Sequence, residues 1–316
     1  MKVLANDGLA KSGIAALGLN GFEVDLTSVA QDQLVDYINQ NEIDVLLVRS
    51  ATQVRKDIID NCASLKIIGR GGVGMDNIDV EYAREKGLHV INTPAASSHS
   101  VAELVFAHLF GMARFLHDSN RNMPLEGDSK FKHLKKSYAK GVELRGKTLG
   151  LIGFGRIGQA TAKIAIGLGM NVVAYDPFID AVNLEIEFFD HQALFFNINT
   201  ITKEEVLKQA DFISLHVPAQ KDYIISTKEF DLMKDNAFLV NAARGGVIDE
   251  VALVQALESG KIASAALDVF ENEPTPEIQL LMNPNLSLTP HIGAATSEAQ
   301  DRIGTELAEQ IVELLK

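Results

Sequence analysis

Short runs of apolar residues alternate with helical patterns along most of this chain. In the first third, apolar and β-branched runs predict strands at residues 3–5, 45–48, 66–68 and 89–91, and helix-like stretches such as residues 32–40 lie between them. Alternation of strands and helices is typical of parallel sheets covered by helices. The sequence therefore predicts an α/β protein whose first third forms a small doubly wound sheet.

A long helical pattern follows this sheet, and a second alternating series follows the helix. Apolar residues recur at helical spacing over residues 100–120, and Ser100 with Glu103 has the spacing of a capping box, which predicts that the helix begins at Ser100. Six further strands are predicted at residues 148–153, 171–176, 211–217, 237–242, 264–269 and 286–289. A final amphipathic helix is predicted from about Ser297 to Leu315.

The length and charge of the chain narrow its class. A chain of 316 residues exceeds what one hydrophobic core usually covers, so two domains are predicted. The 29 Lys and Arg residues against 42 Asp and Glu give a net charge of −13 without any basic block, which argues against nucleic acid and anionic membranes as partners. The single cysteine, Cys62, cannot form an intramolecular disulfide, and neither a signal peptide nor an apolar run of about 18 residues is recognisable. We expect a cytoplasmic protein.

A glycine-rich turn after the first strand of the second series indicates a dinucleotide site. Gly153, Gly155 and Gly158 have G-x-G-x-x-G spacing and lead directly into a helix, with Arg156 and Ile157 in the same loop. In such turns the first glycine allows a tight turn, the second lets the backbone approach a pyrophosphate, and the third brings helix and strand together. The free N–H groups of the helix N-terminus then face the anion.

The residues after the next strand favour NAD as the cofactor. That strand ends in Asp176, 18 residues after Gly158, where a carboxylate would bond the adenosine ribose hydroxyls. Pro177, Phe178 and Ile179 follow, so no basic residue is placed to receive the 2′-phosphate of NADP. Strand, helix and acid together favour an NAD site over the alternative that the glycines serve a tight turn without a ligand.

Three polar residues after later strands could carry hydride-transfer chemistry, which needs a base for a hydroxyl proton and a cation for the substrate. Arg244, Glu273 and His291 each follow a predicted strand, and ligands of open α/β sheets bind at that end of the strands. His291 would act as the base, Glu273 would fix its tautomer, and Arg244 would grip a carboxylate by two hydrogen bonds. Each alone has a structural alternative, but their joint occurrence favours catalysis. His216, also at a strand end, is interpreted as structural lining of the cofactor site.

Seven motifs occur in this chain in a specific order, namely GRGGVGMDNIDVEYAREKGLHVINTP, SVAEL, GKTLGLIGFGRIGQ, HVP, NAARGGVIDE, ALDVFENEP and TPHIGAAT. In these motifs and their spacing, over nearly its whole length, the chain resembles the D-isomer-specific 2-hydroxyacid dehydrogenases. Within that family it is most similar to D-3-phosphoglycerate dehydrogenases of a short form without a C-terminal regulatory domain. We therefore expect no inhibition by serine.

The resemblance implies a fold and a set of roles. It implies two doubly wound domains, with a Rossmann NAD domain (residues 94–287) inserted into a smaller flavodoxin-like substrate domain (residues 1–93 and 288–316). It implies that the three polar residues named above are catalytic and that Asp268 faces the nicotinamide amide. It further implies a homodimer formed mostly through the NAD domain.

The resemblance also implies contacts with a small substrate. The implied substrate-binding residues are Arg49, Ser50, Gly72, Val73, Gly74, Ser97, Lys136 and Arg244. In the family, backbone N–H groups of the loop at residues 72–74 help to hold the substrate carboxylate, and cations corresponding to Arg49 and Lys136 hold a phosphate. Ser97 stands where relatives often carry asparagine. For Lys136, a solvated lysine-rich face is an equal alternative.

Three functions are open from the sequence. The leading one is oxidation of 3-phospho-D-glycerate by NAD to 3-phosphohydroxypyruvate, in serine biosynthesis. The second is reduction of an unphosphorylated 2-oxo acid such as hydroxypyruvate, glyoxylate or pyruvate, and the third is an NAD-sensing interaction protein without catalysis. No metal site is expected. An aromatic stretch at residues 183–200, longer than in relatives, is interpreted as packing or an interface.

Overall fold

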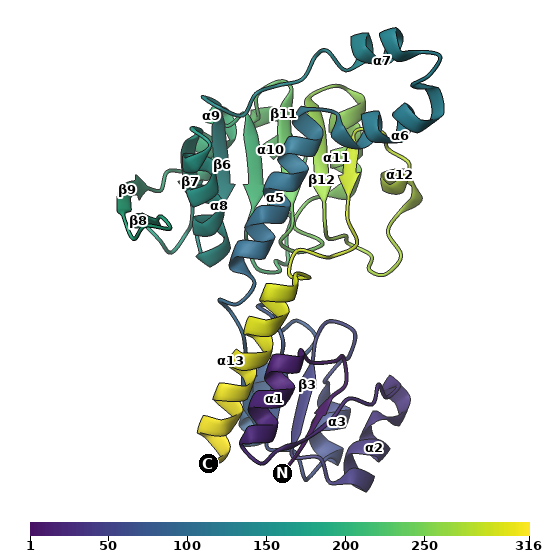
Figure 1. The fold of residues 1–316 in the computed structure, drawn as a ribbon, viewed down its shortest axis with the longest axis vertical. Coiled ribbons are helices and arrows are strands. Elements are labelled where there is room, and N and C mark those ends of the chain that lie inside the picture. Colours follow the sequence, from purple (N-terminus) through teal and green to yellow (C-terminus); the bar gives the residue numbers. More distant parts are fainter. The chain divides into compact units, whose positions relative to one another are not determined.

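The computed structural model describes all 316 residues, which form two compact units (Figure 1). Unit 1 comprises Met1–Ser100 and Ala294–Lys316, and unit 2 comprises Val101–Gly293. Each unit contains a parallel sheet between helices, so the predicted α/β class is confirmed. No helix combines the length and the apolar composition that crossing a membrane requires.

The chain passes between the units after Ser100 and after Gly293. Both points lie a few residues later than the expected boundaries after residues 93 and 287. Arg302 donates through Nε to the carbonyl oxygen of Ala96 at 2.9 Å, which ties the segment before Val101 to unit 1. β13 (Leu286–Leu288) pairs within the sheet of unit 2, and the loop after it is hydrogen-bonded to Asp268 of the same unit. The assignment of the two units to substrate and cofactor stays a prediction.

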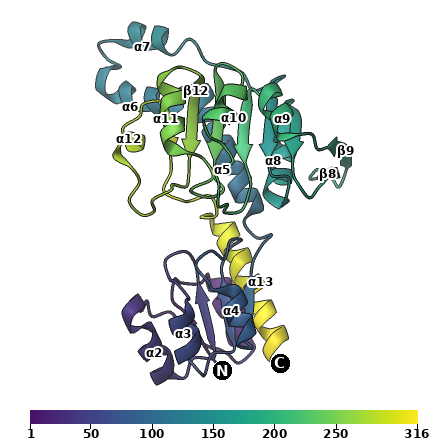
Figure 2. The ribbon, with the colours of Figure 1, turned by 180° about the vertical axis from the view of Figure 1, so that it is seen from behind.

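Unit 1 is a five-stranded parallel sheet in the order β2-β1-β3-β4-β5. The strands are β1 (Lys2–Ala5), β2 (Glu23–Asp25), β3 (Val45–Val48), β4 (Ile67–Arg70) and β5 (His89–Asn92). One face is covered by α1 (Lys11–Leu19) and α13 (Ser297–Leu315), and the other by α2 (Leu34–Asn41), α3 (Lys56–Asn61) and α4 (Val80–Glu85), with a 3₁₀ turn at Gln31–Gln33 before α2 (Figures 1 and 2). The predicted doubly wound sheet is confirmed.

Side chains alternate along β1, so this strand contributes residues to both cores of unit 1. Val3 packs on the side of α1 and α13, whereas Leu4 packs on the opposite side, and both are fully buried. On the first side α1 and α13 approach closely at Gly13, where a Cβ would lie 2.7 Å from the Cα of Gly304. β2 is not among the predicted strands, because only one of its three residues is apolar.

Unit 2 is a six-stranded parallel sheet in the order β13-β12-β11-β10-β6-β7. Besides β13, its strands are β6 (Thr148–Ile152), β7 (Asn171–Tyr175), β10 (Phe212–Leu215), β11 (Ala237–Asn241) and β12 (Ile262–Leu267), which confirms the six predicted ones. One face is covered by α5 (Ser98–Ala113) and α8 (Arg156–Gly167), the other by α9 (Lys203–Gln209), α10 (Thr227–Leu232) and α11 (Glu250–Glu258) (Figures 1 and 2). The order of the strands switches between β6 and β10, where open sheets bind ligands.

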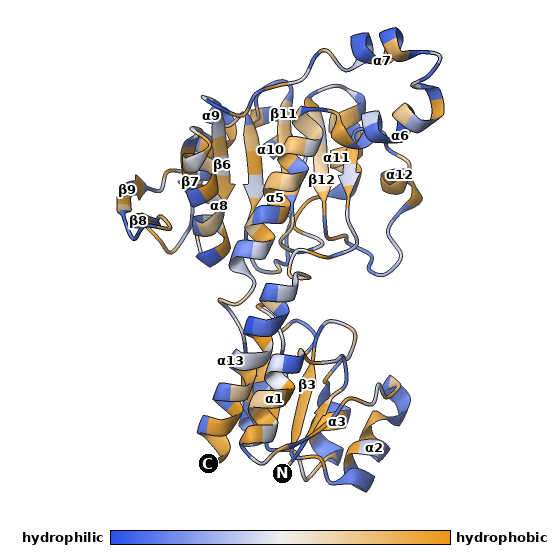
Figure 3. Cartoon of the chain, in the orientation of Figure 1, coloured by the Kyte–Doolittle hydropathy of each residue, from blue (hydrophilic) through white to orange (hydrophobic).

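Three shorter helices complete unit 2. They are α6 (Leu116–Glu126) and α7 (Phe131–Ser137), which follow α5, and α12 (Ile278–Leu281), which precedes β13. Figure 3 shows that hydrophobic residues concentrate in the strands of both sheets, with polar residues on the outer faces of the helices. This distribution is what packing a sheet between two helix layers requires.

The predicted start of α5 is wrong by one half-turn. The helix begins at Ser98, so Ser100 lies inside its first turn and no capping box forms with Glu103. The Ser100 hydroxyl instead lies 2.8 Å from the Thr296 hydroxyl. This partner is distant in sequence, so the local pattern could not indicate it.

The aromatic stretch forms a two-stranded antiparallel hairpin, β8 (Ala181–Glu187) and β9 (Ala193–Asn199). Leu184 is opposite Phe196, and this pair packs against the core of unit 2. Phe188, Phe189 and Phe195 are 46%, 98% and 61% exposed, so they do not contribute to packing within the unit. Packing within the unit is therefore confirmed for Phe196, and an interface stays the prediction for the three exposed phenylalanines.

Candidate active site

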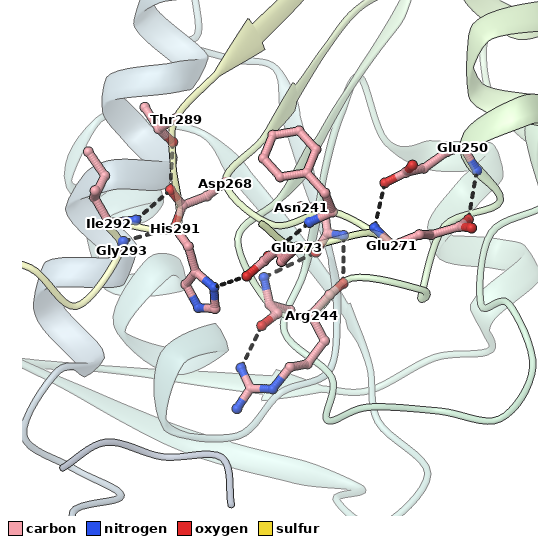
Figure 4. A network of polar contacts seen from close by, with 12 residues as sticks. Asn241, Arg244, Glu250, Asp268, Glu271, Glu273, Thr289, His291, Ile292 and Gly293 are labelled. Atoms are coloured by element: carbon pink, nitrogen blue, oxygen red, sulfur yellow. Dashed lines mark hydrogen bonds and ion pairs between the residues drawn. The ribbon is translucent and has the colours of Figure 1, made fainter. Parts of the chain in front are cut away.

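Arg244, Glu273 and His291 lie in three loops that follow neighbouring strands. They come after β11, β12 and β13, which are adjacent in the sheet of unit 2. All three strands are parallel, so the loops emerge at the same edge, and Figure 4 shows the three side chains gathered there. The structure thus brings together the three residues that the sequence nominates.

The imidazole of His291 is paired with the carboxylate of Glu273. Nδ1 of His291 lies 2.8 Å from Oε2 of Glu273, and the two side chains are 41% and 36% exposed. The other carboxylate oxygen, Oε1, accepts the backbone N–H of Phe270 at 3.0 Å, which fixes the orientation of the carboxylate. A carboxylate beside Nδ1 keeps the proton on that nitrogen, so Nε2 of the neutral ring is the acceptor that can take a proton from a ligand.

The backbone around His291 is held in an uncommon conformation. His291 has φ of +55°, a left-handed geometry that costs free energy for a residue with a Cβ. Asp268 stabilises it, because its carboxylate accepts the N–H groups of Ile292 and Gly293, both at 2.8 Å. Asp268 is 1% exposed and also accepts the Thr289 hydroxyl at 2.6 Å. In this structure its carboxylate bonds thus serve the His291 loop, and its implied role beside the nicotinamide amide stays a prediction.

The loop of Arg244 packs against the loop that leads to Glu273. Asn241 supports it, since its amide nitrogen donates to the carbonyl oxygen of Arg244 at 2.9 Å. A Cβ on Gly245 would clash with the backbone carbonyl of Phe270, so only glycine permits this contact. The Arg244 guanidinium donates to the carbonyl oxygen of Ala243 at 2.6 Å and is partly exposed, so it can also meet an anionic ligand (Figure 4).

The glycine turn after β6 has the steric properties of a dinucleotide cradle. A Cβ on Gly153, which has φ of +95°, would clash with the carbonyl oxygen of His216, and one on Gly158 would clash with the carbonyl oxygen of Gly153. A Cβ on Gly155 would meet no atom within 4 Å, so this glycine faces open space. No side chain caps the N-terminus of α8 there. Open space in front of uncapped helical N–H groups fits the pyrophosphate of NAD.

Two further residues that the sequence nominates for the cofactor lie beside this turn. The carboxylate of Asp176, just after β7, accepts the N–H of Phe154 at 2.8 Å and that of Phe178 at 2.9 Å, which holds it beside the glycine turn. His216 follows β10, and both of its ring nitrogens are buried without a hydrogen-bond partner. Burial lowers the pKa of His216 to about 3, so its ring is neutral. Buried ring nitrogens without a protein partner beside the glycine turn fit a residue that lines a binding site.

The residues nominated for substrate contacts in unit 1 gather at the carboxyl edge of its sheet. Arg49 follows β3, and a small hollow beside it is also lined by Gly8, Gly71 and Gln300. Ser50 comes next in the chain. The loop after β4 contains the segment 72–74, with Gly72 at φ of +148°, Val73 36% exposed, and Gly74. Ser97 is buried just before α5.

Gln300, in the first turn of α13, was not nominated from the sequence. Its amide nitrogen donates to the carbonyl oxygen of Ala294 at 2.9 Å, which fixes the side chain at the hollow. A glutamine on an amphipathic helix resembles a solvated residue, so the sequence carries no signal for this placement.

Lys136 does not join the group in unit 2. It is exposed on α7, which follows the far end of α5, and Figures 1 and 2 show α7 at the end of unit 2 opposite the loops after β11–β13. Lys136 and Arg244 therefore lie at opposite ends of unit 2. The expected phosphate contact of Lys136 stays a prediction.

The chain is similar to known proteins in sequence and in fold. The family model described as "D-isomer specific 2-hydroxyacid dehydrogenase, NAD binding domain" matches residues 106–293. The hydroxypyruvate reductase of Thermotoga maritima is 47% identical over 98% of this chain and 97% of its own length. The D-3-phosphoglycerate dehydrogenase of Methanocaldococcus jannaschii is 45% identical over 100% of this chain, which spans only 58% of that relative. The structure of a glyoxylate reductase from Paecilomyes thermophila has a TM-score of 0.80 at 29% identity, covering 98% and 93% of the two chains.

The open space at Gly155 yields a prediction. Gly155→Ala should leave the free energy of unfolding within about 0.5 kcal/mol, because the added methyl meets no protein atom. It should weaken NADH binding on the order of tenfold, about 1.4 kcal/mol, because the methyl occupies the approach of the pyrophosphate. Fluorescence titration with NADH measures this. Gly167→Ala, at the other end of α8 and equally unobstructed, is the control, and an unchanged NADH affinity in Gly155→Ala contradicts the assignment.

Proposed function

We propose a substrate for this chain, which belongs to the D-isomer-specific 2-hydroxyacid dehydrogenase family and is an NAD-dependent enzyme. The proposed reaction is 3-phospho-D-glycerate + NAD⁺ → 3-phosphohydroxypyruvate + NADH + H⁺. The observation that carries it is a second partly exposed arginine at a sheet edge, Arg49 in unit 1, in addition to Arg244 in unit 2. Arginine suits the binding of a phosphate as well as that of a carboxylate.

The three residues of unit 2 have complementary roles in this proposal. NAD, when bound, supplies the acceptor for the hydride from the hydroxyl-bearing carbon. Nε2 of His291 takes the hydroxyl proton, and Glu273 stabilises the resulting imidazolium through the 2.8 Å contact at Nδ1. Arg244 holds the substrate carboxylate by two hydrogen bonds and so orients the carbon. Asp176, followed by no basic residue, supports NAD in preference to NADP.

Substitution of the base and of the carboxylate ligand should have separable effects. His291→Ala should lower kcat by roughly 10²-fold or more, the usual scale of general acid–base catalysis, with the NADH dissociation constant unchanged within a fewfold. Arg244→Ala should in addition raise KM for the 2-oxo acid, because carboxylate binding in the ground state is lost. Steady-state kinetics and NADH titration measure both effects. Comparable damage to NADH binding in the two variants would show that the side chains are misplaced.

Several curated relatives support the phosphorylated substrate. Besides the archaeal relative, the D-3-phosphoglycerate dehydrogenase of Bacillus subtilis is 37% identical over 100% of this chain, which spans 57% of that relative. A second candidate is hydroxypyruvate reductase, and the observation that favours it is the 47% identity to the Thermotoga maritima enzyme over nearly the full length of both chains. The two candidates differ in a single chemical group, the phosphate.

The preference for a phosphorylated substrate can be tested by substituting Arg49. The wild-type enzyme should have a kcat/KM for phosphohydroxypyruvate about tenfold or more above that for hydroxypyruvate. Arg49→Gln should lower kcat/KM for phosphohydroxypyruvate by about tenfold to hundredfold, which is the effect of losing one charged hydrogen bond, and should leave kcat/KM for hydroxypyruvate unchanged. Arg84→Gln, which removes an exposed cation elsewhere in unit 1, is the matched control. Equal or higher efficiency of the wild-type enzyme with hydroxypyruvate would replace the first candidate by the second.

We further propose that the chain forms a homodimer through unit 2. α6 has no residue buried within unit 2, although it carries apolar side chains: Leu116 and Leu125 are 61% and 76% exposed. Phe131, at the start of α7, is 56% exposed. A group of exposed apolar side chains on neighbouring helices is typical of a protein interface.

The dimer proposal places Leu125 in the interface. Leu125→Glu should therefore reduce the sedimentation coefficient from that of a dimer to that of a monomer, because a buried unpaired carboxylate is costly. Leu19→Glu, at a leucine that is 90% exposed on α1 of unit 1, is the control and should remain dimeric. A wild-type protein that sediments as a monomer would reject the proposal.

A further inference from the structure

A buried histidine of α5, His108, has a partner for each ring nitrogen in or just after β13 of unit 2. It is 5% exposed. Its Nδ1 lies 2.9 Å from the Ser287 hydroxyl, and its Nε2 lies 3.0 Å from the Thr289 hydroxyl. Ser287 and Thr289 are two residues apart along the strand direction, so both can face the same side, toward α5. The ring therefore bridges a core helix to the residues immediately before His291.

The direction of each hydrogen bond follows from the proton count. The Thr289 hydroxyl donates its only proton to Oδ1 of Asp268 at 2.6 Å. The Thr289 oxygen must then accept from His108, which places the ring proton on Nε2. Nδ1 is left as an acceptor for the Ser287 hydroxyl. Burial lowers the pKa of His108, with the Asp268 charge acting in the opposite direction, so the neutral tautomer suits this chain of bonds.

The chain of bonds ends at the backbone that presents His291. Asp268 receives the Thr289 hydroxyl on the same oxygen, Oδ1, that accepts the N–H of Ile292, while Oδ2 accepts the N–H of Gly293. These two N–H groups directly follow His291, whose φ of +55° needs such support. The orientation of the Asp268 carboxylate therefore decides where the imidazole lies, and the Thr289 hydroxyl decides that orientation together with the loop amides.

We propose that His108 is a positioning residue for the reaction: as the Nε2–H tautomer it directs the Thr289 hydroxyl onto Asp268, which holds the loop that presents His291. This inference rests on the proposed role of His291 as the proton acceptor. His108 touches no substrate and acts only through Thr289 and Asp268. A histidine in an apolar helical pattern reads as an ordinary core residue, so the sequence gives no sign of this role.

Three variants test this chain of hydrogen bonds from His108 through Thr289 to Asp268, which is called the His108 relay below. His108→Leu removes both ring contacts, Thr289→Val removes the hydroxyl between His108 and Asp268, and His108→Gln keeps an N–H donor that can reach Thr289. We expect the first two to lower kcat by about tenfold or more, because a displacement on the order of 1 Å near the reacting atoms has effects of this size or larger. KM and the NADH dissociation constant should stay within about threefold, since Arg244 and the glycine turn are untouched. His108→Gln should restore kcat to within about threefold of wild type.

Two controls separate positioning from general damage to the core. Val105→Ala removes buried methyl groups from the same helix without touching the relay, so it should lower Tm while keeping kcat within about twofold. Hydrogen exchange measured by mass spectrometry on the peptide spanning residues 288–294 should rise in His108→Leu and not in Val105→Ala. The double variant His108→Leu/Thr289→Val should be about as slow as either single variant, because both break one path.

The outcomes distinguish this inference from the proposed function. Loss of kcat in His291→Ala together with wild-type kcat in His108→Leu would overturn the His108 relay and leave the proposed function intact. Equal loss of kcat in His108→Leu and His108→Gln, or in Val105→Ala at the same Tm, would also overturn the relay. Wild-type kcat in His291→Ala would overturn the proposed function and the relay with it.

Discussion

The register of three neighbouring parallel strands is the constraint on which the site depends. Asn241 of β11 is paired with Leu267 of β12, and Leu267 is paired with Leu288 of β13, so the three strands end on one line across the sheet. The loops that carry Arg244, Glu273 and His291 start from that line. A shift of one strand by one residue would turn its side chains to the opposite face and separate the group. The hydrogen bonds of the sheet, which take no part in a reaction, therefore determine how the three side chains lie relative to one another.

Close backbone contacts then fix the loops above this line. Gly245 lets the Arg244 loop touch the carbonyl of Phe270, whose N–H holds Glu273, so the guanidinium and the carboxylate are coupled through one short segment. Gly153 and Gly158 similarly allow the glycine turn to contact itself and the strand end at His216. Gly155 differs, because it is not needed for any of these contacts. A glycine at position 155 is thus the feature that packing of the protein itself does not explain.

How far the sequence predicts this structure depends on whether the partner of each residue is local. The strands of unit 2, the glycine turn and the trio follow from periodicity and from their place after strands, and the structure has the trio at one sheet edge. The predicted start of α5 is wrong because Ser100 has a partner distant in sequence, Thr296. The hairpin β8–β9 is not predicted because consecutive phenylalanines interrupt its alternation of apolar and polar residues. The relay from His108 could not be predicted, since it joins residues about 180 positions apart.

In the proposed function, the charge of the trio also links proton transfer to the state of the substrate. With neutral His291, the charges of Arg244 and Glu273 cancel, and after His291 accepts a proton the trio carries one net positive charge. The 2-oxo acid is an anion, so it is held more strongly by the protonated site than the hydroxy acid is by the neutral one. The net charge of −13 opposes anion binding, but at physiological salt the Debye length is about 8 Å, so exposed carboxylates farther away are screened. Oxidation of the hydroxy acid in the proposed reaction releases one H⁺, so acid conditions favour reduction of the oxo acid and alkaline conditions favour oxidation of the hydroxy acid.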